Sequence, residues 1–224
     1  MHVCLFDIDG TLLASGGAGK AAMEEALRLE FELPQLVDGV PYAGRTDRAI
    51  ARDLFKIHSI ADSPANWQRF VLAYLRLLPE ALHRHEGRVL PGVSAFLQEL
   101  GGRGDVAIGL LTGNVRDGAR LKLSHYALFD HFAFGAFGDE HFDRNDVALE
   151  ALSVLRRHLG PEKAPSEIWV IGDTPLDVRC ARAIGAKAVA VATGWHSVSE
   201  LEAAEPDLLL PDLSHHAGML ARLI

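Results

Sequence analysis

The sequence predicts an α/β fold, a Rossmann-like doubly wound parallel sheet with a small all-helical domain inserted after the first strand. From Leu90 onward, short apolar runs alternate with amphipathic segments of helical period, separated by Gly and Pro. This alternation is typical of parallel strands joined by helices on both faces of a sheet. Between Ser15 and Arg88 the patterns are helical and contain no convincing strand. We therefore divide the chain into a core, residues 1–14 and 89–224, and an inserted helical domain, residues 15–88.

The individual elements follow from apolar runs, caps and breakers. A buried strand begins the chain at residues 3–6, and Gly10 ends the extended segment. In the insertion, Thr46 and Ser63 are placed to cap two of the helices, and Pro64 fits the first turn of the second one. Helices are expected at residues 20–31, 47–58, 64–82, 92–100, 115–124, 144–159 and 175–185, with a surface helix at the C-terminus. Further strands are expected at residues 106–111, 132–137, 168–171, 188–191 and 208–210.

Composition limits the possible partners. The chain has 224 residues, 49% of them hydrophobic and 23% charged, as in ordinary globular proteins, and its formal net charge is −8. This charge, with no basic run, argues against nucleic acid and anionic membranes as partners. No apolar stretch reaches the roughly 20 residues of a spanning helix, and no basic leader precedes the first strand. We expect a cytoplasmic protein, monomeric or homodimeric, with Cys4 and Cys180 as buried reduced thiols.

Unusual polar side chains occur where the predicted strands end. Asp7 and Asp9 follow the first strand, residues 112–114 (Thr-Gly-Asn) follow the second, and Asp173 and Asp177 follow the fourth. Ligands of open parallel sheets bind outside the carboxyl ends of the strands. Like charges at the edge of an apolar core repel one another unless a cation compensates them. These positions therefore predict a ligand site at one edge of the sheet.

The acids favour a hard divalent cation. Asp7, Asp9 and Asp173 can supply three carboxylate or carbonyl oxygens to one ion. Mg²⁺ prefers such oxygen ligands, in octahedral geometry, and retains some of its waters. There is no cluster of Cys and His at zinc spacing. We predict Mg²⁺ as the cofactor.

A phosphate group is the anion that this edge could bind. Thr112 and the backbone amides of Gly113 and Asn114 lie where a strand passes into a helix, a turn that points N–H groups and a hydroxyl at an anion. None of the five lysines follows the third strand, but Arg144 begins the helix after it. A guanidinium there would fit both phosphate and a carboxylate. The alternative is a surface arginine paired with Asp143 or with Asp146.

Three segments together resemble the haloacid dehalogenase superfamily. They are residues 7–11 (Asp-Ile-Asp-Gly-Thr), 110–114 (Leu-Leu-Thr-Gly-Asn) and 172–177 (Gly-Asp-Thr-Pro-Leu-Asp), which look like its first, second and fourth motifs. The insertion is similar to the small cap domain of that superfamily, so the resemblance covers the whole chain. Within it, the chain most resembles the phosphoglycolate-phosphatase-like branch.

The resemblance implies a role for each motif residue. Asp7 would attack phosphorus and form an aspartyl-phosphate. Asp9 would protonate the leaving alkoxide and then deprotonate the hydrolytic water. Thr112 would bind the phosphoryl group that is transferred. Asp173 would bind Mg²⁺ with the Asp7 carboxylate and the Asp9 backbone carbonyl, and Asp177 would ligate the ion or support it through water.

The third motif and the insertion each contribute a further candidate position. The superfamily usually has a lysine in the third motif, and Arg144 would replace it here. Residues 44–46 (Gly-Arg-Thr) could form a loop facing the site, with Arg45 meeting a carboxylate or second phosphate of the substrate. A surface role for Arg45 is an equal alternative. Residues 15–19 and 86–88 would act as hinges that let the cap open and close.

The implied activity is Mg²⁺-dependent hydrolysis of a small soluble phosphomonoester, such as a phosphoglycolate-like acid, a sugar phosphate or a nucleotide monophosphate. A sugar phosphomutase uses the same two acids and remains the main alternative. A dehalogenase normally lacks the acid at Asp9, and a phosphonate-cleaving relative would need Lys20 or Lys56 as a Schiff base. A non-catalytic protein of this fold is a further alternative, which the retained acids disfavour.

Overall fold

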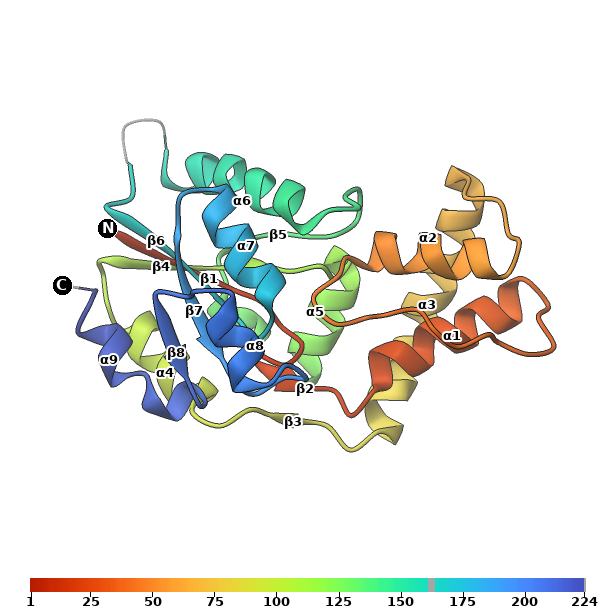
Figure 1. Cartoon of the computed structure of the whole chain (residues 1–224), viewed down its shortest axis with the longest axis horizontal. Helices are drawn as coiled ribbons and strands as arrows, with labels where there is room; N and C mark the ends of the chain where they lie inside the picture. Colours follow the sequence, from red (N-terminus) through yellow and green to blue (C-terminus); the bar gives the residue numbers. More distant parts are fainter. Residues whose placement is uncertain (161–163, 224) are drawn as a thin grey trace.

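A six-stranded parallel sheet forms the centre of the protein (Figure 1). The computed structural model describes residues 1–160 and 164–223. The strand order is β5-β4-β1-β6-β7-β8, and each neighbouring pair is parallel. The strands are β1 (His2–Phe6), β4 (Val106–Leu111), β5 (Phe134–Ala136), β6 (Glu167–Gly172), β7 (Lys187–Val191) and β8 (Leu208–Leu210). The predicted fold class is confirmed.

Helices cover both faces of this sheet. On one face lie α4 (Val93–Gly101), α5 (Arg116–His125) and the C-terminal elements, whose apolar side chains form one buried cluster with the sheet. On the other face α6 (Arg144–Leu159), α7 (Pro175–Ala183) and α8 (Val198–Ala203) form a second cluster. In β1, Cys4 and Phe6 belong to the first cluster and Val3 and Leu5 to the second. Burial on both faces explains why this strand is an uninterrupted apolar run.

The insertion consists of three helices, α1 (Ala18–Glu30), α2 (Asp47–Ile57) and α3 (Pro64–Arg84), which we call the helical insertion. The hydroxyls of Thr46 and Ser63 accept hydrogen bonds from backbone N–H groups of α2 and α3, as their positions predict. The three helices enclose a third apolar cluster, to which Val115 of the core also contributes. Figure 1 shows the helical insertion at one end of the elongated molecule, next to α5.

Some short elements differ from the predictions. Leu13–Ala14 (β2) and Arg88–Val89 (β3) form a two-stranded antiparallel ribbon where the helical insertion joins the core. Two-residue strands have too few positions for a period of two, so no sequence pattern reveals them. The C-terminus contains two short helices, η2 (Leu213–His215) and α9 (Ala217–Leu220), rather than one surface helix. Met219 and Leu223 are fully buried, so this segment is part of the core. A further short helix is η1 (Phe129–His131).

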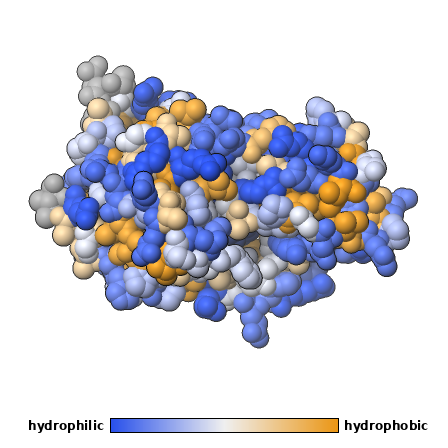
Figure 2. Space-filling view, viewed as in Figure 1, coloured by the Kyte–Doolittle hydropathy of each residue, from blue (hydrophilic) through white to orange (hydrophobic). Residues whose placement is uncertain are grey.

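The surface contains few large apolar side chains. Figure 2 shows a mainly hydrophilic face with apolar groups on the helical insertion and on the core. Cys4 and Cys180 are buried and free, as predicted. Within residues 1–160 and 164–223, no helix is both long and apolar enough to cross a membrane.

The helical insertion provides a test of its own packing. Leu78 on α3 is fully buried, whereas Leu72 on the same helix is 59% exposed. We predict that Leu78→Ala lowers the free energy of unfolding by about 2–5 kcal/mol, because a buried leucine leaves a cavity. Leu72→Ala should change it by less than about 0.5 kcal/mol. Urea unfolding followed by circular dichroism measures both, and equal effects would contradict the assignment of the α3 core face.

Candidate active site

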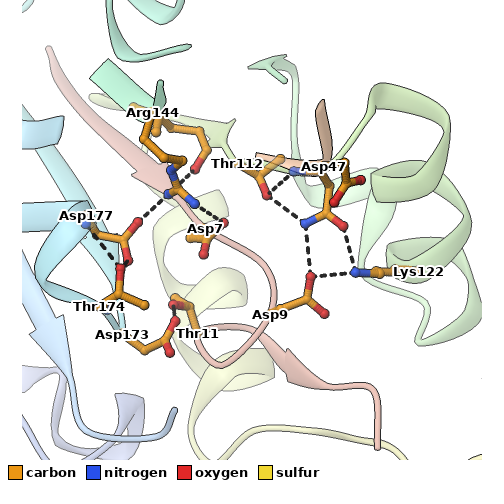
Figure 3. A network of polar contacts seen from close by, with 12 residues as sticks. Asp7, Asp9, Thr11, Asp47, Thr112, Lys122, Arg144, Asp173, Thr174 and Asp177 are labelled. Atoms are coloured by element: carbon orange, nitrogen blue, oxygen red, sulfur yellow. Dashed lines mark hydrogen bonds and ion pairs between the residues drawn. The ribbon is translucent and has the colours of Figure 1, made fainter. Parts of the chain in front are cut away.

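Most of the sequence-predicted site residues, though not Arg45, meet at the carboxyl edge of the sheet in two adjoining groups (Figure 3). One group surrounds Asp7 and includes Arg144, Asp173 and Asp177. The other surrounds Asp9 and includes Thr112, Asn114 and Lys122. The order β4-β1-β6 explains the meeting, because β1 lies between the two strands whose ends carry the other motifs.

The two acids of the first motif point into different groups. In a continued strand, Asp7 and Asp9 would lie on the same face. Instead β1 ends at Phe6, and Gly10 has a φ of 84°, a left-handed conformation that favours glycine. The chain therefore turns directly after Asp7, whose N–H still donates to the Ile171 carbonyl of β6 at 3.0 Å.

Arg144 joins Asp7 to Asp177. Its Nη1 lies 3.5 Å from Oδ1 of Asp7, and its Nη2 forms an ion pair with Oδ1 of Asp177. Arg144 is the first residue of α6, where Asp143 caps the helix by accepting from the Asn145 N–H at 2.8 Å. The cap fixes the start of the helix and thereby the direction of the arginine. The predicted surface alternative for Arg144 does not hold, because the side chain is buried.

Asp173 lies on the side of Asp7 that faces away from Arg144 (Figure 3), and neighbouring segments pack closely around its carboxylate. Thr11 Oγ1 donates to its Oδ1 at 3.0 Å. A Cβ on Gly194 would lie 1.7 Å from Oδ2 of Asp173, and a Cβ on Gly10 would lie 2.3 Å from the same oxygen. Both positions need glycine so that the backbone can approach the carboxylate. Neither glycine was among the predicted site residues, because this requirement arises from segments far apart in the sequence.

Burial makes this acidic group electrostatically costly. Burial raises the pKa of Asp7 to about 6; Arg144 opposes the shift, and the carboxylate of Asp177 adds to it. Burial raises the pKa of Asp173 well above its ordinary value, with Asp177 and Asp7 contributing further. A nearby divalent cation would reverse these shifts by favouring the ionised carboxylates.

The carboxylates also fit such a cation geometrically. Oxygens of Asp7, Asp173 and Asp177 lie within 4.8 Å of one another. Oδ1 of Asp7 is buried and, apart from its 3.5 Å ion pair with Arg144, has no hydrogen-bond partner among the described residues, so it keeps a lone pair for a metal. Both oxygens of Asp177 are already engaged, Oδ1 by Arg144 and Oδ2 by Thr174. Asp7 and Asp173 are therefore the better direct ligands, with Asp177 as the residue that supports them.

Asp9 is held by a different set of groups. Lys122 Nζ donates to its Oδ2 at 2.6 Å, and Asn114 Nδ2 donates to the same oxygen at 2.9 Å. Asn114 Nδ2 also donates to Thr112 Oγ1 at 2.9 Å, and Asn114 Oδ1 accepts from Lys122 at 2.6 Å. Thr112 Oγ1 acts as acceptor in these contacts, which leaves its hydrogen to donate to an anion.

Lys122 is the main site residue that the sequence analysis missed. It lies on α5 and is buried together with Gly118, Ala119 and Leu123. Burial alone lowers the pKa of Lys122, but the carboxylates of Asp9 and Asp47 more than offset this and raise it. The spacing of residues 118, 119, 122 and 123 is a sequence signal, since it places a lysine on the apolar face of a predicted helix.

Asp47 extends from the helical insertion to the same region. Its N–H donates to the Gly113 carbonyl at 2.7 Å, and its Oδ2 accepts from the Val115 N–H at 2.8 Å. Burial raises the pKa of Asp47 to about 7, although Lys122 and the Val115 N–H oppose the shift. The helical insertion thus contacts the Thr-Gly-Asn loop directly and binds the N–H of Val115, the residue that precedes α5.

Known proteins resemble the chain over most of its length. Residues 4–191 match the haloacid dehalogenase-like hydrolase family. The chain belongs to this family. It is 31% identical over 207 residues to a phosphoglycolate phosphatase of Chromobacterium violaceum, covering 88% of each protein. It is 29% identical over 210 residues to a phosphoglycolate phosphatase of Synechococcus elongatus, covering 94% of this chain and 92% of that protein.

The fold is also that of solved family structures. The structure of CbbY from Rhodobacter sphaeroides in complex with phosphate superposes with a TM-score of 0.75 at 19% identity, over 96% of each chain. The predicted membership of the haloacid dehalogenase superfamily, in its phosphoglycolate-phosphatase-like branch, is therefore confirmed. The family match also makes the chain an enzyme of the hydrolase class.

Within this family framework, the side chain of Arg45 does not join either group. Its Nη2 donates to Asp53 Oδ2 at 2.7 Å, and its Nη1 donates to the Pro41 carbonyl at 3.0 Å. Only its backbone is close to the site, since a Cβ on Gly113 would lie 2.1 Å from the Arg45 carbonyl oxygen. A substrate-binding role for Arg45 stays a prediction and would require the guanidinium to leave Asp53.

Divalent cation should stabilise the folded protein. At about 100 times its Kd, a ligand that binds only the native state contributes about 2.7 kcal/mol, which raises the melting temperature of a chain of this size by roughly 5–10 °C. We predict such a rise with Mg²⁺ in the wild-type protein, and its loss in Asp173→Asn. Asp130→Asn, which changes an exposed acid on η1, should retain it. Thermal melts with and without Mg²⁺ make the comparison, and an Mg²⁺ effect retained in Asp173→Asn would contradict this site.

The glycine next to Asp173 gives a second test. Gly194→Ala should raise the Mg²⁺ concentration needed for half-maximal thermal stabilisation by roughly 10–100-fold, because a displaced ligand binds the ion poorly. Gly101 on α4 is the control, since a Cβ there meets no atom within 4 Å. Gly101→Ala should leave the Mg²⁺ titration unchanged. Unaltered Mg²⁺ affinity in Gly194→Ala would show that Asp173 is not a ligand.

Proposed function

We propose that the protein is a Mg²⁺-dependent phosphatase of small soluble phosphomonoesters that acts through an aspartyl-phosphate on Asp7. The observation that carries this proposal is the separation of the two acids. Asp7 is buried beside Arg144 with an oxygen that makes no hydrogen bond among the described residues. Asp9 is held by neutral and cationic donors, and its side chain is 39% exposed. One acid is thus placed to attack and the other to exchange a proton.

Arg144, Thr112 and the amides of the Thr-Gly-Asn loop would receive the phosphoryl group. The Arg144 guanidinium lies beside the nucleophile, where it would offset negative charge on the phosphoryl oxygens. The Thr112 hydroxyl and the N–H groups of Gly113 and Asn114 begin the turn into α5. Donors at such a turn suit an anion. Mg²⁺, held by Asp7, Asp173 and the Asp9 carbonyl with Asp177 in support, would supply further charge neutralisation.

The proton transfers fall to Asp9. As the Asp7 carboxylate bonds to phosphorus, the ester P–O bond breaks and its electron pair stays on the leaving oxygen, which takes the proton of Asp9. In the second half of the reaction, the hydrolysis of the aspartyl-phosphate, the Asp9 carboxylate removes a proton from water as the water oxygen bonds to phosphorus. The bond from phosphorus to Asp7 then breaks, which restores both acids and releases phosphate.

We further propose that residues 15–88 act as a cap over a core of residues 1–14 and 89–224. Asp7, Thr112 and Arg144 are buried, and Asp47 of the helical insertion contacts the Thr-Gly-Asn loop, so the insertion would move to admit substrate. Contacts that join it to the core include Asp47 on the Thr-Gly-Asn loop, and Phe142 beneath the guanidiniums of Arg48 and Arg52. The ribbon of β2 and β3 and residues 15–19 would be the hinges. Closure would exclude water from the reaction.

The substrate class rests on the relatives. Two curated relatives are phosphoglycolate phosphatases, which favours a small phosphorylated acid, with sugar phosphates and nucleotide monophosphates as the other candidates. Asp9 would serve no leaving group in a dehalogenase, and its two hydrogen bonds favour a phosphatase instead. A sugar phosphomutase would use the same acids. A panel of phosphorylated metabolites, assayed for free phosphate and for isomerised sugar phosphate, separates the two activities. Cytoplasmic location and a monomeric or homodimeric state remain predictions.

Removal of the nucleophile is the direct test. Asp7→Asn should abolish release of 4-nitrophenol from 4-nitrophenyl phosphate, with a loss of at least about 10⁴-fold, because the amide cannot form the acyl phosphate. EDTA should abolish the activity of the wild-type enzyme, and added Mg²⁺ should restore it. Asp130→Asn is the matched control and should retain full activity. Turnover by Asp7→Asn at the wild-type rate would refute the nucleophile, and an inactive wild-type enzyme on every substrate would support the non-catalytic alternative.

A further inference from the structure

Lys122 reaches the site from a distance along α5. It lies eight residues after Asn114, two helical turns from the loop that it contacts. Side chains of a helix lean toward its N-terminus, so a long lysine on the inner face of α5 extends back to the strand ends. There its ammonium is buried and donates to Asp9 and Asn114, both at 2.6 Å.

The two oxygens of Asp9 are in different environments. Oδ2 accepts from both Lys122 and Asn114, whereas Oδ1 has no hydrogen-bond partner among the described residues. Two donors on one oxygen fix the rotation of the carboxylate and direct the other oxygen away from them. The side chain is 39% exposed, so Oδ1 is the oxygen that an incoming molecule can reach.

Lys122 also determines which way Asn114 faces. Because Asn114 Oδ1 accepts from the ammonium, its Nδ2 must turn toward Asp9 and Thr112, to which it donates at 2.9 Å each. The amide therefore links the acid to the phosphate-binding hydroxyl. If the amide oxygen and nitrogen of Asn114 exchanged places, an N–H would face the ammonium of Lys122 and an oxygen would face the carboxylate of Asp9. Both contacts would then be repulsive.

We propose that Lys122 is a positioning residue that anchors Oδ2 of Asp9, directly and through Asn114, so that Oδ1 carries the proton exchanged with the leaving group and with the hydrolytic water. The proposal rests on the proposed phosphatase function. Lys122 itself touches no reacting atom, and its effect is confined to the steps in which Asp9 transfers a proton. It should matter most for leaving groups that need protonation.

The test compares leaving groups in the full-length enzyme with Mg²⁺. Lys122→Met should lower kcat/KM for an alkyl phosphomonoester by roughly 10²-fold, the usual contribution of a general acid. With 4-nitrophenyl phosphate, whose leaving group needs little protonation, kcat/KM should fall by less than about 3-fold. Slow hydrolysis of the aspartyl-phosphate should then give a burst of 4-nitrophenol. An equal loss on both substrates without a burst, or no loss on either, would overturn the proposal.

A double-mutant cycle separates positioning from a purely structural role. In the Asp9→Asn background, Lys122→Met should cause no further loss of kcat/KM, because the group on which it acts is absent. A full additional loss would show that Lys122 acts elsewhere. If Lys122→Met does not fold, Lys122→Arg serves instead. The planar guanidinium of arginine retains the positive charge but cannot make the same contacts as the ammonium. Lys122→Arg should therefore show the same dependence on the leaving group as Lys122→Met.

The outcome for Lys122 is distinct from that for the function. A wild-type enzyme that releases no phosphate from either substrate would refute the proposed function and this proposal together. An active wild-type enzyme whose Lys122 variants lose activity equally on both substrates would refute only the role of Lys122.

Discussion

Carboxylates buried side by side where β1 and β6 end are the constraint on which the site depends. Asp7, Asp173 and Asp177 are all buried, with oxygens within 4.8 Å of one another. Such a group can persist only where cations and donors compensate its charge. Arg144 provides this beside Asp7, from the first turn of the helix that follows β5. The buried carboxylates at the edge of the sheet therefore depend on a positive side chain from a flanking helix, α6.

The two acids of the first motif pair with different cationic side chains. Arg144 pairs with Asp7 and Asp177, whereas Lys122 pairs with Asp9. Because β1 ends at Phe6, the chain turns and each acid meets its own cation rather than sharing one. An acid that must attack and an acid that must exchange protons need different surroundings. The different partners of Asp7 and Asp9 suit the roles proposed for these two acids.

Local sequence was sufficient for the sheet and for the positions at its edge. The strand at residues 106–111 is buried on both faces and so reads as a continuous apolar run, and Asp143 marked the helix that carries Arg144. Lys122 was missed because its partner Asp9 lies 113 residues away, and no local pattern contains that contact. Arg45 was expected near substrate from its loop alone, but its guanidinium bonds to Asp53 on α2. Side-chain direction at such positions depends on tertiary neighbours.

The contacts of Asp47 link the helical insertion to the same chemistry. Its carboxylate accepts from the Val115 N–H just before α5, and its own N–H donates to the Gly113 carbonyl of the Thr-Gly-Asn loop. The helix that follows Val115 is the helix that carries Lys122. If the helical insertion opens as proposed, Asp47 would leave the Val115 N–H, so the loop and the residue before α5 would lose a partner that closure restores. Substrate entry and the ordering of the groups that hold Asp9 would then depend on the same few hydrogen bonds.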